Sequence, residues 1–410
     1  MSDSTPLTHY VCTHLKNISV WIAILTLVLA GVIGGGIWLF IKTNNLKGGL
    51  ADFILANPDS TAMTAYTFNE NGDYVQDGSA LFYNADQPLV MASAMKIIIL
   101  AAYADAVVNG ELDPNERILI SDVEKYHLPM TDGSAHSTGL RSLGIQVDDL
   151  GFARDQTAMV TLDDLARIMI HYSGNAETDY LITRLGTEKI ASVMQKAGLV
   201  HHTPIRLILG STLAAFDHEI PSLSVSHLQD VIVEVSYGDT SYLDRLIELY
   251  LSDTQWRTAQ IEFMLSINKS AVDGLDIWTY QTTAAELLPK GTAREYAQLM
   301  ARIASGTFIS PEVSELVQNS LETVPLDWIL RALFLDRFGA KDGITAGVLT
   351  LASYGTPGRG PLKGQARVVV IVVTILPPDQ WAEQVRFQGH YLLAIDLIKA
   401  TGLFDGFANR

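Results

Sequence analysis

The 410-residue sequence contains a single cysteine, Cys12. This excludes an internal disulfide framework and a zinc site built from cysteines. Basic residues are also scarce, with 28 Lys and Arg against 45 Asp and Glu and a formal net charge of -17. Because a phosphate backbone requires a positively charged face, nucleic acid is not expected as the main partner. Histidines such as those at 201–202 lack companions at metal-ligand spacing, so neither a metal site nor a cofactor is expected.

Charged residues make up only 18% of the chain and hydrophobic residues 48%, with a mean hydropathy of +0.20. One segment explains this unusual value for an acidic protein. Residues 18–41 (ISVWIAILTLVLAGVIGGGIWLFI) carry no charge and exceed the roughly 20 residues that a helix needs to cross a bilayer. Trp21 and Trp38 lie near its ends, where interfacial aromatic residues are common. The segment is too long for a signal-peptide core and predicts an uncleaved transmembrane anchor.

The anchor divides the chain into a short tail (1–17), the membrane segment (18–41), a polar linker (42–50) and one large body (51–410). Positive charges flank both sides of the segment, so the positive-inside rule barely discriminates between the two orientations. A short tail before a long body favours a single-pass protein of the cell membrane with an extracytoplasmic body. The sequence leaves the oligomeric state open.

Runs of β-branched and aromatic residues predict strands at both ends of the body. Apolar residues at helical spacing predict helices between them. A sheet built from both chain ends, with an inserted all-helical lobe, is the natural assembly of these elements into a two-lobed α/β fold. Strands are expected over 61–68, near 74–82, over 344–354 and over 366–376. Helices are expected over 93–109, from 161 onward, and over 176–185, 187–196, 292–305, 311–321 and 379–401, with mainly helical structure over 200–288 and a long loop over 131–151.

The first candidate motif is Ser93-Ala94-Met95-Lys96, at the start of an apolar helix. Residues three apart share a helix face, so the amine of Lys96 is expected to point at the Ser93 hydroxyl. A buried lysine has a lowered pKa and can accept a proton, which would make Ser93 a covalent nucleophile. Alone, the motif fits a helix-cap serine and a surface lysine at least as well.

Two weaker motifs follow in order. Ser173-Gly174-Asn175 interrupts two expected helices, and Lys341-Asp342-Gly343 comes just before the expected strand at 344–354. Each motif alone is also ordinary turn chemistry. In that order and on those elements, however, the three motifs resemble the motif set of the class A β-lactamase-like, penicillin-recognising serine enzymes.

This resemblance extends over about residues 51–404 and implies a β-lactamase/transpeptidase-like fold. It implies that Ser93 is acylated, that Lys96 is its base and that Ser173 passes the proton to the leaving nitrogen. Lys341 would hold Ser173 and the electrostatics of the pocket. The substrate would contact Asn175, Asp342, Gly343 and Ile344. The backbone amides of Ser93 and Ile344 would form the oxyanion hole.

The sequence departs from the family in two places. The family's deacylating glutamate is expected shortly after Gly198, yet no acidic residue occurs between Glu188 and Asp217. Asp217 and Glu219 could serve only if the loop were lengthened, so an acyl-enzyme should hydrolyse slowly. Asp342 stands where a threonine or serine is usual, and it would repel a substrate carboxylate unless it were protonated or paired with Lys341.

The insertion over 200–288, which carries Trp256 and many tyrosines, either walls the pocket or is simply an enlarged packing lobe. The leading hypothesis is a membrane-anchored serine acyl-transfer enzyme acting on a β-lactam, a cell-wall peptide or an ester. A D,D-peptidase that penicillin merely acylates is one alternative. A catalytically silent binding or sensor domain is the other.

Overall fold

The computed structural model describes residue 42 and residues 44–267, 276–323 and 335–400. The expected membrane anchor at 18–41 and the tail before it lie outside the described residues. Within the described ranges, no helix has the length and apolar character needed to span a bilayer.

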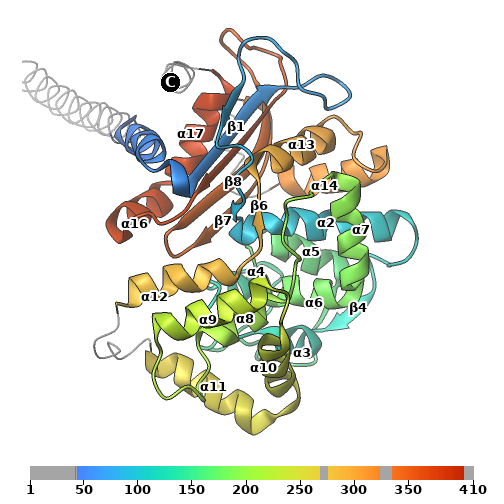
Figure 1. The fold of residues 1–410 in the computed structure, drawn as a ribbon. Coiled ribbons are helices and arrows are strands. Elements are labelled where there is room, and N and C mark those ends of the chain that lie inside the picture. Colours follow the sequence, from blue (N-terminus) through green and yellow to red (C-terminus); the bar gives the residue numbers. More distant parts are fainter. Residues whose placement is uncertain (1–41, 43, 268–275, 324–334, 401–410) are drawn as a thin grey trace, which may run out of the picture.

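A five-stranded antiparallel sheet joins the two ends of the body, as the sequence predicts (Figure 1). Its strand order is β2-β1-β9-β8-β7. The strand from the N-terminal part, β1, pairs along its full length with β9 from the C-terminal part. The strands are β1 (Thr61–Thr67), β2 (Leu81–Tyr83), β7 (Leu335–Thr345), β8 (Val348–Pro357) and β9 (Arg367–Val373).

Two strand predictions need correction. The expected strand over 344–354 is instead the end of β7, a tight turn and the start of β8, because Gly347 adopts φ 72° and reverses the chain. The Lys341-Asp342-Gly343 motif therefore lies inside β7 and not ahead of a strand. The expected strand near 74–82 is reduced to β2 and an isolated bridge between Phe68 and Tyr74.

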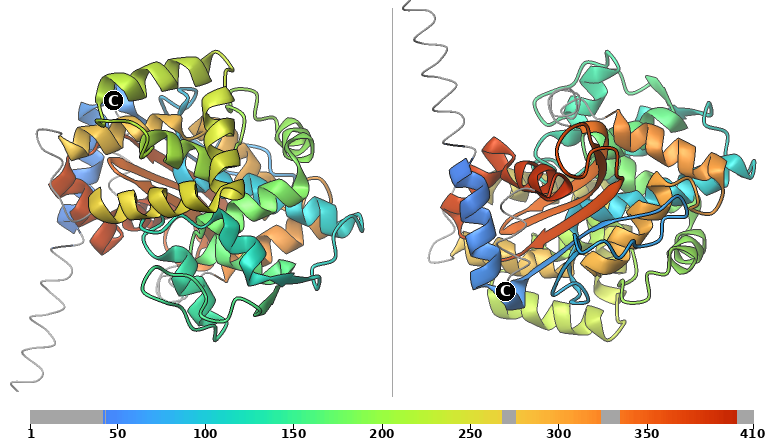
Figure 2. Two further views of the ribbon diagram at one scale, coloured as in Figure 1. Left: turned by 90° about the horizontal axis from the view of Figure 1, so that it is seen from below. Right: turned by 90° about the horizontal axis from the view of Figure 1, so that it is seen from above.

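Both faces of the sheet are covered, so β9 is apolar at every position after its first residue. Val369, Ile371 and Val373 pack on one face with Leu50 and the C-terminal helices. Val368, Val370 and Val372 pack on the other face with α2, α13 and α14. Figure 2 shows this layering from two further sides. The helices are α2 (Lys96–Val108), α13 (Ala293–Ala304), α14 (Pro311–Glu322), α16 (Pro378–Phe387) and α17 (Gly389–Ile398).

The expected linker differs from the structure, because residues 44–56 are helical. Leu46 and Leu50 are buried, and the Lys47 amine lies 2.5 Å from a carboxylate oxygen of Asp396 on α17. The single helix expected over 379–401 is two helices, α16 and α17. They are separated at Gln388, which adopts φ 55°.

The helical lobe contains α5 (Leu162–His171), α6 (Asn175–Leu185) and α7 (Thr187–Ala197), close to the expected boundaries. Thr161 caps α5 and forms a reciprocal capping box with Asp164. The expected loop over 131–151 contains a helix, α4 (Ala135–Ser142). Short elements complete this part: β3 (Leu89–Val90), β4 (Arg117–Leu119), α3 (Ile120–Val123), β5 (Met159–Thr161) and β6 (Lys290–Gly291).

The insertion over 200–288 is helical, as expected, and has an apolar core of its own. Its helices are α8 (Ile208–Ala215), α9 (Val225–Ser236), α10 (Ser241–Ser252), α11 (Thr254–Ile267) and α12 (Ile277–Ala284). Trp256 is buried in this core.

Candidate active site

Ser93 lies in a 3-10 turn, Ala92–Met95, that leads into α2. The helix expected from residue 93 begins only at Lys96, because Ala92 adopts φ 44° and the first turn is wound more tightly. A left-handed conformation at a residue with a side chain is costly and clusters at functional sites. Strand β7 presses against this turn: a Cβ built on Gly343 would lie 2.4 Å from the Met91 carbonyl oxygen and 2.9 Å from the Ser93 amide nitrogen. Only glycine allows this approach.

The side chain of Lys96 is fully buried beside the second motif. Its amine lies 2.6 Å from the Ser173 carbonyl oxygen, 3.3 Å from Ser173 Oγ and 2.9 Å from Asn175 Oδ1. The sequence instead predicts that this amine points at the Ser93 hydroxyl. Within the described residues, Lys96 makes no hydrogen bond to Ser93, although the two share one turn.

Burial and the positive charge of Lys341 lower the pKa of Lys96 to about 7. Removing an ammonium group from water disfavours its charged form, and a second cation adds repulsion. The nearby carboxylates of Asp132, Asp179 and Glu177 act in the opposite direction. The amine is therefore divided between its charged and neutral forms near neutral pH.

Ser173 and Asn175 lie where α5 ends and α6 begins. Ser173 adopts φ 71°, so its backbone is left-handed like that of Ala92. Gly174 between them leaves space for a carboxylate, since a Cβ there would lie 2.0 Å from Glu177 Oε2. The break between the helices thus aims one hydroxyl and one amide oxygen at the same lysine.

Lys341 is 3% exposed, and its amine lies 2.9 Å from Asp342 Oδ1. Burial acts to raise the pKa of Asp342, but the charges of Lys341 and His390 and the hydrogen bonds to the carboxylate hold it below its usual range. Asp342 is therefore ionised and paired. The resemblance implied that Lys341 holds Ser173, but within the described residues Lys341 bonds to Asp342 instead.

A cavity of about 1070 Å³ brings the three motifs together. Six of the eight sequence-predicted site residues line it: Ser93, Ser173, Asn175, Lys341, Asp342 and Ile344. The other two lie next to lining residues. The Lys96 amine bonds to Ser173, and Gly343 packs against the 3-10 turn that carries Ser93, called the nucleophile turn below.

Two acidic residues of the described chain line this cavity, Asp132 and Asp342. No motif in the sequence points to Asp132, which lies in the segment expected to be a loop. Its Oδ2 accepts a hydrogen bond from the His136 amide at 2.9 Å, at the start of α4. Asp217 and Glu219 do not line the cavity, because Asp217 bonds to Tyr242 and Glu219 pairs with Arg245.

A network of buried charged side chains lies next to Asp132, around His136. His136 Nδ1 lies 2.7 Å from Glu177 Oε1, and its Nε2 lies 3.4 Å from Glu124 Oε1. Burial acts to lower the pKa of His136, but the two glutamates raise it to about 10. Asp179 is also fully buried and accepts the backbone amides of Ile208 and Leu209, which fixes the start of α8. Burial raises the pKa of Asp179 to about 7.

Both interpretations of the insertion hold in part, because it has an apolar core that contains Trp256 and it also walls the cavity. The residues involved are not Trp256 or the tyrosines but apolar side chains from α11 and α12, including Met264, Ile267 and Trp278. Trp381 of α16 faces them from the other lobe.

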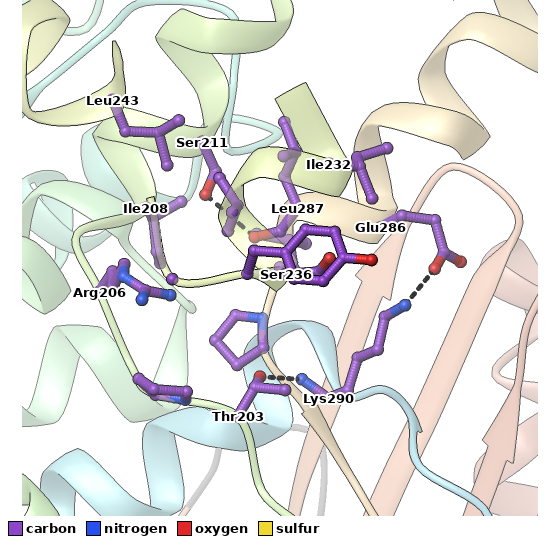
Figure 3. Close-up of a pocket in the computed structure, with 16 residues that line it drawn as sticks. Thr203, Arg206, Ile208, Ser211, Ile232, Ser236, Leu243, Glu286, Leu287 and Lys290 are labelled. Atoms are coloured by element: carbon purple, nitrogen blue, oxygen red, sulfur yellow. Dashed lines mark hydrogen bonds and ion pairs between the residues drawn. The ribbon is translucent and has the colours of Figure 1, made fainter. Parts of the chain in front are cut away.

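A second, smaller cavity of about 340 Å³ lies within the insertion (Figure 3). It shares Ser211 and Leu288 with the larger cavity and contains none of the predicted site residues. Figure 3 shows Ser211 Oγ bonded to the Leu287 carbonyl oxygen, and the Lys290 amide bonded to Thr203 Oγ1.

Residues 60–343 match the model of the β-lactamase enzyme family. Among solved structures, PBP-A is similar with 16% identity and a TM-score of 0.47, covering 89% of this chain and 97% of that one. A β-lactamase from Sphaerobacter thermophilus has 15% identity and a TM-score of 0.48, covering 84% and 91%. One from Chitinophaga pinensis has 14% identity and a TM-score of 0.48, covering 84% and 97%.

No curated protein matches the sequence. The family match nevertheless spans well over half of the 410 residues and includes all three motifs. The chain belongs to the β-lactamase enzyme family and is a serine hydrolase of the penicillin-recognising fold.

Proposed function

We propose that this protein is a membrane-anchored serine hydrolase or acyl-transferase that works through an acyl-enzyme on Ser93. The observation that carries the proposal is the state of Lys96. Its amine is fully buried, has a pKa of about 7 and lies one turn from Ser93 and 3.3 Å from Ser173 Oγ. A base with a pKa near the working pH is well suited to proton transfer.

In the first step, the neutral amine of Lys96 takes the proton of Ser93 Oγ as that oxygen attacks the substrate carbonyl. The carbonyl oxygen gains a negative charge, which the backbone amides of Ser93 and Ile344 stabilise as donors. The close approach of Gly343 to the nucleophile turn supports this pairing, since a Cβ built on Gly343, the neighbour of Ile344, would lie 2.9 Å from the Ser93 amide nitrogen.

In the second step, the tetrahedral intermediate collapses and the leaving group accepts a proton. Ser173 relays this proton from Lys96, whose amine is within hydrogen-bond distance of Ser173 Oγ. The product is an ester between the acyl group and Ser93, together with the released alcohol or amine. Asn175 holds the lysine through Oδ1, and its amide nitrogen is left to donate to the acyl group.

Deacylation requires a water and a base. Asp342 is paired with Lys341, and Asp132 is engaged by the His136 amide. No glutamate is among the described residues that line the cavity, so the family's deacylating base has no counterpart there and the acyl-enzyme should persist. This favours a second candidate, a D,D-peptidase or transpeptidase that penicillin acylates without rapid release. For either activity we propose the extracytoplasmic side of the cell membrane, with residues 18–41 as the anchor.

The test is the intact mass of the full-length protein in lipid nanodiscs, after incubation with penicillin G and separately with a fluorophosphonate. A single adduct on Ser93 is expected with the fluorophosphonate and a slowly decaying one with penicillin. Ser93→Ala should abolish both adducts, whereas Ser211→Ala, which alters a cavity-lining hydroxyl outside the three motifs, should leave them in place. Failure of both probes to modify the wild-type protein would exclude the acyl-enzyme and leave a binding domain.

A further inference from the structure

The catalytic cavity has an apolar compartment at one end. Helices α11, α12 and α16 supply it, so it joins the insertion to the C-terminal lobe. Figure 1 shows α12 and α16 on either side of the end of β7. The side chains that form the compartment are Met264, Ile267, Ile277, Trp278, Trp381 and Val385.

Two tryptophans hold the compartment together. The rings of Trp278 and Trp381 meet edge to face, with centroids 5.4 Å apart and an interplanar angle of 65°. The Trp381 indole nitrogen donates to the Val348 carbonyl oxygen at 3.3 Å, which ties the ring to the sheet. Such aromatic pairs combine a large apolar area with a fixed geometry.

The compartment is continuous with the nucleophile. Strand β7 carries Ile344 beside the Ser93 turn, and the next two residues, Thr345 and Ala346, line the same cavity on the way to the tryptophans. An acyl group whose carbonyl lies at the Ser93 and Ile344 amides can therefore extend along the end of β7 into the apolar end of the cavity.

The charges of the lining disfavour an anionic substrate. Among the described residues that line this cavity, Lys341 is the sole lysine or arginine, and it is paired with Asp342. Asp132 adds a second carboxylate. An additional substrate carboxylate would find no unpaired cation in this lining, and burying an unpaired charge is costly.

Helix α16 also contacts the segment that follows the proposed anchor. Lys42 pairs with Glu383, and Gln384 Nε2 donates to the Leu46 carbonyl oxygen at 3.0 Å. The two helix residues in these contacts, Glu383 and Gln384, lie between Trp381 and Val385 in the sequence. The wall of the apolar compartment is thus attached to the part of the chain nearest the membrane segment.

We propose that the substrate is an uncharged ester with an apolar acyl chain, and that the chain occupies this compartment. The inference rests on the proposed function of Ser93. Ser93 Oγ forms the new ester bond to the acyl carbon, the original ester bond breaks, and the alcohol leaves with the proton relayed by Ser173. Water then releases the carboxylic acid and restores the Ser93 hydroxyl.

The experiment measures kcat/KM of the full-length protein in nanodiscs for p-nitrophenyl acetate and p-nitrophenyl octanoate. We expect the octanoate to be preferred by roughly tenfold or more, because each buried methylene adds binding energy. Trp278→Ala and Trp381→Ala should each reduce this octanoate-to-acetate ratio at least about threefold. Trp381→Phe, which keeps an aromatic ring, should retain most of it.

Tyr237→Ala is the matched control, since Tyr237 is an exposed aromatic residue that lines only the smaller cavity. Tyr237→Ala should keep the wild-type preference for octanoate. Partition of the ester into lipid affects all variants alike, so comparison with this control cancels it. A second pair of substrates, soluble monooctanoylglycerol and a diacylglycerol within the nanodisc, distinguishes a dissolved ester from a membrane lipid as the source of the chain.

Equal rates for acetate and octanoate, or a preference that both tryptophan variants retain, would overturn the compartment proposal. Fluorophosphonate labelling of Ser93 in the same samples separates this result from failure of the proposed function. A labelled serine without chain preference removes the acyl compartment alone, whereas an unlabelled serine removes the acyl-enzyme itself.

Discussion

The buried amine of Lys96 lies 2.9 Å from Oδ1 of Asn175, so the first and second motifs meet directly. The amide oxygen is neutral and accepts a hydrogen bond from the amine in either protonation state. It therefore holds the lysine in place without the charge that a carboxylate would add. Desolvation remains the largest influence on the pKa of Lys96, which is about 7.

The first prediction is that acylation of Ser93 depends on pH with a midpoint of about 7. Protonated Lys96 cannot accept the Ser93 proton, so the rate should fall about tenfold for each pH unit below the midpoint and level off above it. The fluorophosphonate phosphonylates Ser93 with loss of fluoride and requires the same deprotonation of Ser93 Oγ. The rate of this reaction, followed by intact mass from acid to alkaline pH, measures the dependence.

Asn175→Asp tests whether Lys96 is the group whose titration sets this midpoint. A carboxylate in contact with the amine stabilises its charged form, so the midpoint should move to higher pH by about one unit or more. An unchanged midpoint in this variant would assign the titration to a group other than Lys96.

The second prediction concerns Gly343→Ala. The added Cβ would lie 2.4 Å from the Met91 carbonyl oxygen, so β7 and the nucleophile turn must separate. Because misplaced reacting groups lose rate steeply, acylation should fall about a hundredfold with the fold retained. The measurement is the fluorophosphonate rate alongside a thermal unfolding curve.

Gly49→Ala provides the matched comparison. Gly49 lies in the helix over residues 44–56, and a Cβ there meets nothing within 4 Å. The substitution should leave acylation unchanged and stabilise the protein by about 0.5–1 kcal/mol, the usual advantage of alanine in a helix. Equal loss of acylation in both glycine variants would contradict the steric argument.

The third prediction concerns Asp342→Thr. Removing the carboxylate leaves Lys341 free to bind an anion. Acylation by penicillin G, which carries a carboxylate, should then accelerate about tenfold, corresponding to about 1.4 kcal/mol, while a neutral phenyl ester should react at nearly the same rate. Second-order acylation rates for the two compounds give the comparison.

Glu286→Gln controls for the change in net charge. Glu286 lines only the smaller cavity and pairs with Lys290 there. This variant should treat both compounds as the wild type does. An Asp342→Thr variant that accelerates neither compound, or both equally, would refute charge repulsion as the reason for the selectivity.

The fourth prediction concerns the buried pair between His136 and Glu177. The pKa of His136 is raised from 6.5 to about 10, so its stabilising effect is fully present below pH 6.5 and is lost as pH rises through about 10. His136→Asn leaves Glu177 buried without its cation and should cost about 3–5 kcal/mol at pH 6. The free energy of unfolding in urea, measured for both proteins at pH 6 and pH 10, should show a smaller difference at the higher pH.

Arg245→Gln is the corresponding control, because Arg245 pairs with Glu219 and both side chains are exposed. An exposed pair contributes about 1 kcal/mol or less. A His136→Asn loss that stays constant with pH would show that packing, and not the ion pair, is responsible.

Much of the fold could be predicted from local patterns in the sequence. The capping residues Thr161 and Asp164, the helix-ending Gly198 and the β-branched run of β9 act through neighbouring residues, so their effect is visible in the sequence. The helix over residues 44–56 was missed because its two glycines and polar residues favour a linker. Buried Leu46 and Leu50 and the bond from Lys47 to Asp396, some 349 residues away, hold it in place.

The candidate site divides in the same way. The three motifs were recognisable because their residues are close in sequence. The partner of Lys96 could not be read from spacing, since the helical face that it shares with Ser93 says nothing of Ser173, 77 residues away. Asp132, Trp278 and Trp381 join the site only through tertiary packing, and no local signal distinguishes them from ordinary loop and core residues.

The pairing of β1 with β9 has a consequence for how the protein is synthesised. The central partner of the first strand begins at Arg367, more than 300 residues after Thr61. A chain emerging from the ribosome must therefore carry its first strand without this partner, and paired at most with the short β2, until nearly all of the protein has appeared. Long-range pairing of this kind slows folding and exposes aggregation-prone edges. We expect truncation anywhere before residue 373 to yield insoluble protein, so that only a fully emerged chain acquires the catalytic cavity.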